Sequence, residues 1–173
     1  MRRGDGVAAV GRKAAALGAR RKQRMEAGGK AAARAVRRVA APGATGAVVA
    51  GRGNNGGDGR VAARFLDGHD VTVHLLGRPE TIRTRIAREN WDALRAAEYD
   101  VRTVVDAAAL DLGDPDVVVD AMLGTGVTGP LREPEATAAD AVNRADATVV
   151  SVDVPSGVNA DTGEVAGVAA DAD

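Results

Sequence analysis

The 173-residue sequence contains no cysteine, and this absence excludes several kinds of site at once. Disulfide frameworks, zinc–thiolate centres, iron–sulfur clusters and cysteine nucleophiles all require that side chain. Aromatic residues are almost as scarce, with one Trp, one Tyr and one Phe. A surface that stacks nucleic-acid bases on aromatic rings is therefore not expected. For the same reason, the core must be built from Ala, Val, Leu and Ile.

Long hydrophobic runs are also missing. No apolar run approaches the roughly 18 residues that a membrane span requires, and no apolar stretch follows the first residues as it does in a secretory signal. We therefore expect a cytoplasmic protein that does not insert into a membrane.

Charge is distributed unevenly along the chain. Residues 1–40 carry 12 Lys or Arg and 2 Asp or Glu, whereas the remaining residues carry 11 and 22. Such a basic segment can bind nucleic acid. Its apolar residues keep a helical period, however, so we interpret it as two basic, solvated helices over residues 7–18 and 24–40.

After residue 40, apolar strands alternate with helices. Several strands are apolar throughout, such as the one that contains Val117–Val119. This pattern predicts an α/β domain whose mostly parallel sheet is covered on both faces. We expect strands at 47–50, 70–76, 100–104, 116–122 and 148–152, helices at 58–66, 81–97 and 133–144, and a helical turn at 106–110.

Three unusual segments each follow one of these strands: a glycine-rich loop at 51–59, a second at 124–130, and Asp153–Gly157. In an open parallel sheet, ligands bind outside the carboxyl ends of the strands. We therefore expect the three loops to form one shared site.

The first loop satisfies the G-x-G-x-x-G pattern with Gly51, Gly53 and Gly56. Such glycines allow backbone N–H groups to approach a phosphate at a helix N-terminus. A dehydrogenase site also needs an acidic residue at the end of the second strand, and this strand ends in Leu76-Gly77-Arg78 instead. A glycine-rich turn without a ligand is the other interpretation.

The polar residues of the three loops suggest a cation and a proton carrier. Asn55, Asp120 and Ser156 offer hard oxygen ligands, which suit a monovalent or alkaline-earth cation. Asp120 could equally cap the turn that follows its strand. Asp153 is then the carboxylate left for proton transfer.

These motifs resemble those of the NAD(P)H-hydrate epimerase family, the YjeF N-terminal domain. The resemblance rests on Asn54–Gly59, Asp120–Gly126 and Val152–Gly157, and on Met25–Gly28, which is similar to the M-E-N-A-G stretch of that family. It implies a Rossmann-like three-layer α/β/α sandwich. It also implies an isomerase that interconverts the R and S epimers of hydrated NADH and NADPH (NADHX and NADPHX) in cofactor repair.

The family resemblance also assigns roles to individual residues. It implies that Asp153 contacts the substrate and is the catalytic acid or base, and that Asn55, Asp120 and Ser156 bind K⁺. The residues that it places along the substrate are Asn54, Asn55, Gly56, Gly57, Asp58, Gly124, Thr125, Gly126, Val127, Thr128, Gly129, Pro130 and Asp153.

The resemblance further implies a dehydratase domain or protein as partner, and a homodimer. We expect one YjeF N-terminal-like domain over residues 1–173. Because the family continues with a further strand and helix, we also expect the C-terminal end of that domain to be missing. A non-catalytic nucleotide-binding module and an inactive truncated remnant are the alternative functions.

Overall fold

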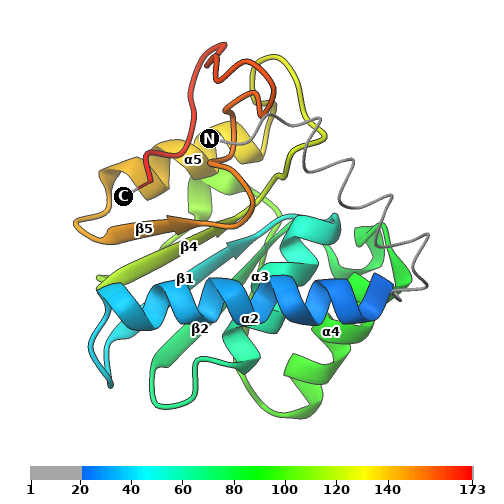
Figure 1. The fold of residues 1–173 in the computed structure, drawn as a ribbon, viewed down its shortest axis with the longest axis vertical. Coiled ribbons are helices and arrows are strands. Elements are labelled where there is room, and N and C mark those ends of the chain that lie inside the picture. Colours follow the sequence, from blue (N-terminus) through cyan, green and yellow to red (C-terminus); the bar gives the residue numbers. More distant parts are fainter. Residues whose placement is uncertain (1–20, 173) are drawn as a thin grey trace.

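The computed structural model describes residues 21–172 of the chain (Figure 1). Five strands form one sheet in the order β3-β2-β1-β4-β5, and every neighbouring pair is parallel. The elements are α2 (Arg21–Val39), β1 (Thr45–Ala50), α3 (Asn54–Arg64), β2 (Asp70–Leu76), the 3₁₀ turn η1 (Pro79–Thr81), α4 (Arg85–Ala96), β3 (Asp100–Val104), the 3₁₀ turn η2 (Ala107–Ala109), β4 (Val117–Ala121), α5 (Glu135–Arg144) and β5 (Thr148–Ser151).

The sheet is covered on both faces because its central strands are apolar on both sides. In β1, Val48 and Ala50 pack with residues of α2, α3 and α4, whereas Ala47 and Val49 pack with α5. A third cluster joins α2 to α4 through Met25 and Trp91. This arrangement confirms the expected α/β/α sandwich, and small aliphatic residues build most of its core.

The expected strands are confirmed to within about two residues at each end, but three helices differ from expectation. The helix expected at 58–66 runs from Asn54 to Arg64. The helix expected at 81–97 begins only at Arg85, because η1 and an extended residue precede it. The basic helix expected at 24–40 begins by Arg21. The helix expected at 7–18 lies outside the described residues. Among residues 21–172, no helix is long and apolar enough to cross a bilayer.

Candidate active site

The site lies between β1 and β4, where the order in which the chain adds strands to the sheet reverses. Strands β1 and β4 are adjacent, but β1 leads through α3 to β2 on one side and β4 leads through α5 to β5 on the other. Helices α3 and α5 cover opposite faces of the sheet. The segments that leave the two strands therefore diverge and open a crevice at their carboxyl ends.

The glycine-rich loop predicted at 51–59 is shorter than expected, because α3 already begins at Asn54. A Cβ on Gly56 would lie 1.9 Å from the carbonyl oxygen of Gly51, and one on Gly59 would lie 2.4 Å from the Cβ of Ala121. A Cβ on Gly57 would lie 2.5 Å from the methyl carbon of Met25. The glycines therefore allow α3 to pack closely against the sheet and α2, and this packing outweighs their poor helix propensity.

Hydrogen bonds join the three expected cation ligands to one another. The Asn55 side-chain amide donates to the carbonyl oxygen of Leu123 (2.7 Å), whose own N–H donates to Ser156 Oγ (3.0 Å). Ser156 Oγ in turn donates to Asp120 Oδ1 (2.6 Å). One network thus connects the segments that follow β1, β4 and β5.

Asp120 is completely buried at the end of β4. Its carboxylate accepts hydrogen bonds from the backbone N–H groups of Met122 (3.2 Å) and Ser156 (2.8 Å) and from the hydroxyls of Ser151 (2.9 Å) and Ser156. Burial raises the pKa of Asp120, and these hydrogen bonds oppose the rise. The bond from Met122 confirms that Asp120 caps the turn after its strand.

The same cluster fits a monovalent cation. No Lys, Arg or His within residues 21–172 forms a salt bridge with Asp120. Asn55 Oδ1 is buried, and no described group donates a hydrogen bond to it. The oxygen atoms that could coordinate an ion belong to a single carboxylate and to amide, hydroxyl and carbonyl groups. Such ligands suit a hard ion of low charge. The described residues contain no group of three or more His, Cys, Asp or Glu side chains that could hold a metal.

Asp58, in the second turn of α3, and Asp153, after β5, form an acidic pair at the crevice. Burial, and then the negative charge of Asp153, raise the pKa of Asp58 from 3.8 to about 7. Asp153 as a residue is exposed, but the surrounding walls desolvate its carboxylate and raise its pKa as well. Because its pKa is raised to about 7, Asp58 remains partly protonated near neutral pH and can donate a proton there.

The backbone at Asp153 is also unusual. Its φ of +65° lies in the left-handed region, which residues other than glycine rarely adopt. Such conformations cost free energy and occur often at functional sites. This strain accompanies the placement of the Asp153 carboxylate beside Gly124, where a Cβ would lie 3.2 Å from Asp153 Oδ2.

Two cavities meet at the acidic pair. The first, of about 420 Å³, lies over the glycine-rich segments that follow β1 and β4. The second, of about 720 Å³, lies between the N-terminal parts of α2 and α4. Asn54, Asp58 and Asp153 line both cavities, so the acidic pair stands at their junction.

The predicted substrate-site residues fall into three groups. Most line the first cavity, namely Asn54, Asn55, Asp58, Gly124, Thr125, Gly126, Val127 and Asp153. Gly56 and Gly57 are buried in α3, where they serve the packing described above. Thr128, Gly129 and Pro130 are exposed and line neither cavity.

Sequence patterns missed several lining residues. Arg52, Arg83, Met122, Leu123 and Glu135 also line the first cavity, and Arg52 forms a salt bridge with Glu135 (3.7 Å). The sequence patterns did not predict the second cavity. Its α2 residues, Arg21, Arg24, Met25 and Gly28, recur at helical spacing, which is a signal that could have revealed them.

Comparisons with known proteins identify relatives of this chain. A family model described as "YjeF-related protein N-terminus" matches residues 21–173. The bifunctional NAD(P)H-hydrate repair enzyme Nnr of Methanothermobacter thermautotrophicus is 45% identical over 164 residues, which cover 91% of this chain and 31% of that protein. The NAD(P)H-hydrate epimerase of Cenarchaeum symbiosum is 44% identical over 156 residues, which cover 87% and 71%.

Among solved structures, the crystal structure of yeast ynu0 is similar to this one with a TM-score of 0.81 and 28% sequence identity. The match covers 94% of this chain and 73% of the yeast chain. This chain spans only 31% and 30% of the length of the bifunctional relatives from M. thermautotrophicus and Hyperthermus butylicus. The family match, the sequence identities and the shared fold agree, and the chain belongs to the family of YjeF-related protein N-termini.

Proposed function

We propose that the chain is an NAD(P)H-hydrate epimerase, which interconverts the R and S epimers of NADHX and NADPHX. The names of its relatives support this activity. The observation that carries the proposal is the acidic pair of Asp58 and Asp153 at the junction of two cavities. Each of these cavities has the volume of a small-molecule site.

The chemistry of the substrate requires a proton donor and a proton acceptor. Its hydroxyl group is on C6 of the reduced nicotinamide ring, next to the ring nitrogen. In our proposal, protonated Asp58 donates to this hydroxyl, the C6–O bond breaks to release water, and the nitrogen lone pair forms a C=N bond. Water then adds to the opposite face of C6 and gives a proton to Asp153. Nothing is oxidised or reduced. A proton then passes from Asp153 back to Asp58 through solvent, which restores the starting state of the pair and closes the proton balance.

We also propose that K⁺ binds at Asn55, Asp120 and Ser156, with the Leu123 carbonyl as a further ligand. The buried Asp120 carboxylate and the unpartnered Asn55 Oδ1 support this assignment. When bound, the ion would neutralise the charge of Asp120 and hold the three strand-end segments together. The chain's own carboxyl groups would move the protons.

The cellular setting is proposed on the same basis. The relatives named as bifunctional repair enzymes support a dehydratase as partner, which would restore the cofactor from one epimer. We also propose a cytoplasmic location, where NADH and NADPH are abundant. A homodimer is proposed only from the resemblance of the sequence to the family.

An epimer-resolved chromatographic assay tests the activity. Purified protein is added to one NADHX epimer in K⁺ buffer near neutral pH, where spontaneous interconversion is slow. We expect rapid approach to the R/S equilibrium, and a loss of at least 100-fold in Asp153→Asn and in Asp58→Asn. Asp92→Asn removes an exposed carboxylate of α4 and is the matched control. Full turnover by folded Asp153→Asn would remove Asp153 from the mechanism.

A further inference from the structure

The second cavity has a basic wall that the epimerase chemistry does not use. Arg21 and Arg24 lie one helical turn apart on α2, and Arg85 begins α4 on the other side of the cavity. We call the part of the cavity lined by these three side chains the arginine lobe.

Two cationic side chains at the edge of the arginine lobe share one carboxylate. Glu89 is shared between Arg85 (3.4 Å) and Lys22 (3.6 Å), so one carboxylate faces two cations. The Arg85 side chain is 88% exposed, and such a surface ion pair is weak and easily exchanged for a stronger anion. The acids within the cavity itself are Asp58 and Asp153, which lie at its junction with the first cavity.

Among the described residues, fewer cationic side chains line the first cavity than the second. Its Arg52 is engaged by Glu135, whose side chain is 9% exposed, and only Arg83 stands beside this pair among the described cationic residues that line it. The acidic pair at the junction would repel a phosphate placed there. Within the described cleft, the arginine lobe therefore has the most cationic side chains available to face an anionic group.

We propose that the arginine lobe binds the phosphate groups of a dinucleotide, and thereby places the ring-bearing end of the same molecule at the acidic pair. This inference rests on the proposed function, and it adds where the charged half of the substrate lies. Arginine suits this role, because its planar guanidinium forms paired, charge-assisted hydrogen bonds with phosphate oxygens.

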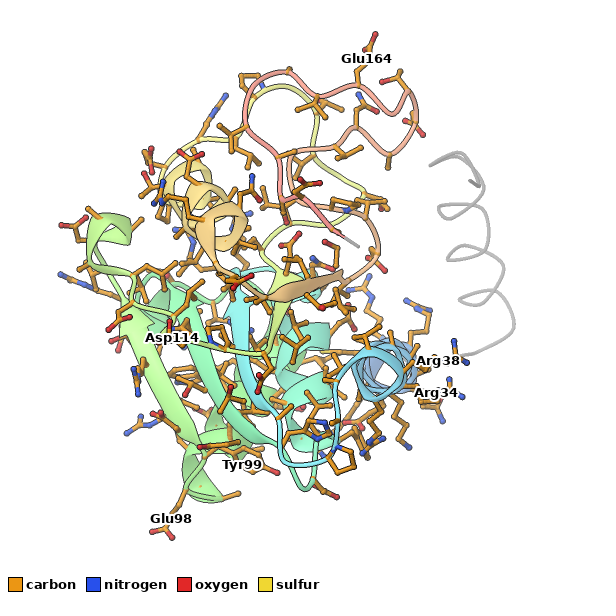
Figure 2. The ribbon with its side chains drawn as sticks, turned by 90° about the vertical axis from the view of Figure 1, so that its left-hand side faces the viewer. Arg34, Arg38, Glu98, Tyr99, Asp114 and Glu164 are labelled. Carbon is orange, nitrogen blue, oxygen red and sulfur yellow. The ribbon has the colours of Figure 1, made fainter. Side chains whose placement is uncertain are left out.

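Calorimetric titration with ADP-ribose, which carries two phosphates, and with phosphate-free adenosine tests the proposal. The variant is the double substitution Arg21→Gln and Arg85→Gln. Its matched control is Arg34→Gln and Arg38→Gln, which also removes two positive charges, both from α2. Figure 2 shows Arg34 and Arg38 pointing away from the sheet, and about 20 Å of helix separates Arg34 from Arg21.

We expect the lobe variant to bind ADP-ribose at least tenfold more weakly than wild type, and the control to bind within twofold of it. Wild-type affinity should also fall more steeply with salt than that of the lobe variant. Adenosine affinity should be the same in all three proteins.

Equal loss in the lobe variant and the control would overturn the proposal, as would no loss in either or no binding of ADP-ribose to the wild-type protein. The epimerase assay tests the proposed function separately. Lobe-dependent ADP-ribose binding without epimerisation would support the arginine lobe and refute the proposed activity. If the protein epimerises its substrate but its ADP-ribose affinity is unchanged by the substitutions at Arg21 and Arg85, the proposed activity is supported and the arginine lobe is refuted.

Discussion

Replacing Asp58 by Asn should make the protein more stable at alkaline pH, although it removes a proposed catalytic group. Burial and the charge of Asp153 raise the pKa of Asp58 from 3.8 to about 7. The folded protein therefore keeps a proton between about pH 4 and pH 7 that the unfolded chain has already released. Over that window the folded state binds more protons, so the stability contributed by Asp58 falls as pH rises, and it stays low above pH 7.

The size of this effect follows from the size of the pKa shift. A rise of about 3 units, at about 1.4 kcal/mol per unit, gives an upper limit of about 4 kcal/mol. Asp58 is partly exposed, so solvent screening reduces the cost, and we expect about 2 kcal/mol. Asn has nearly the same shape without the charge. The Asp58→Asn variant should therefore gain about 2 kcal/mol over wild type at pH 8 and almost nothing at pH 4.5.

Urea unfolding at the two pH values measures this difference. The single tryptophan, Trp91, is buried between α4 and its neighbours and gives a fluorescence signal for the transition. Asp92→Asn is again the control, and its stability should follow wild type at both pH values. A variant that is less stable than wild type at pH 8, or whose gain is the same at pH 4.5 and pH 8, would refute the reasoning.

Three further predictions concern the packing, the helix cap and the cation site. Gly56→Ala should lower the free energy of unfolding by about 2–3 kcal/mol in urea titrations, because its Cβ would meet the Gly51 carbonyl, whereas Gly53→Ala meets nothing within 4 Å and should be neutral. Thr84→Ala should cost about 1 kcal/mol, since Thr84 Oγ1 accepts the N–H of Ala87 at the start of α4. KCl should raise the melting temperature more than tetramethylammonium chloride does, and Asp120→Asn should abolish that difference; an equal response of wild type to both salts would contradict the K⁺ site.

The sequence was sufficient for the sheet because its strands carry a strong signal. Val117–Val119 is apolar without interruption, as a strand buried on both faces must be, and such runs locate strands reliably. The start of α3 was not predictable in the same way. Its first residues are Asn54, Asn55, Gly56 and Gly57, which are poor helix formers. Only contact with β4 and α2 makes them helical, and such tertiary contacts are not visible in the local sequence.

The candidate site likewise has a part that the sequence could predict and a part that it could not. Asn55, Asp120 and Asp153 follow parallel strands, whose ends must meet, so their proximity could be predicted. The second cavity depends on how closely α2 crosses α3. At the crossing, a Cβ on Gly29 would lie 2.4 Å from Val61, so two backbones approach without an intervening side chain. No local pattern in the sequence indicates such an approach, so the pattern places Arg21 only in a basic, solvated segment.

The hydrogen-bond chain through Asn55, Leu123, Ser156 and Asp120 has a consequence for the dynamics of the protein. Each of its hydrogen bonds joins two segments that are far apart in sequence. Local opening of any one segment therefore exposes polar groups of the other two. We expect the three segments to open together, as one cooperative unit in hydrogen exchange. Amide protons along these segments should exchange with a common free energy, and paired substitutions within the chain should cost less than the sum of the single ones.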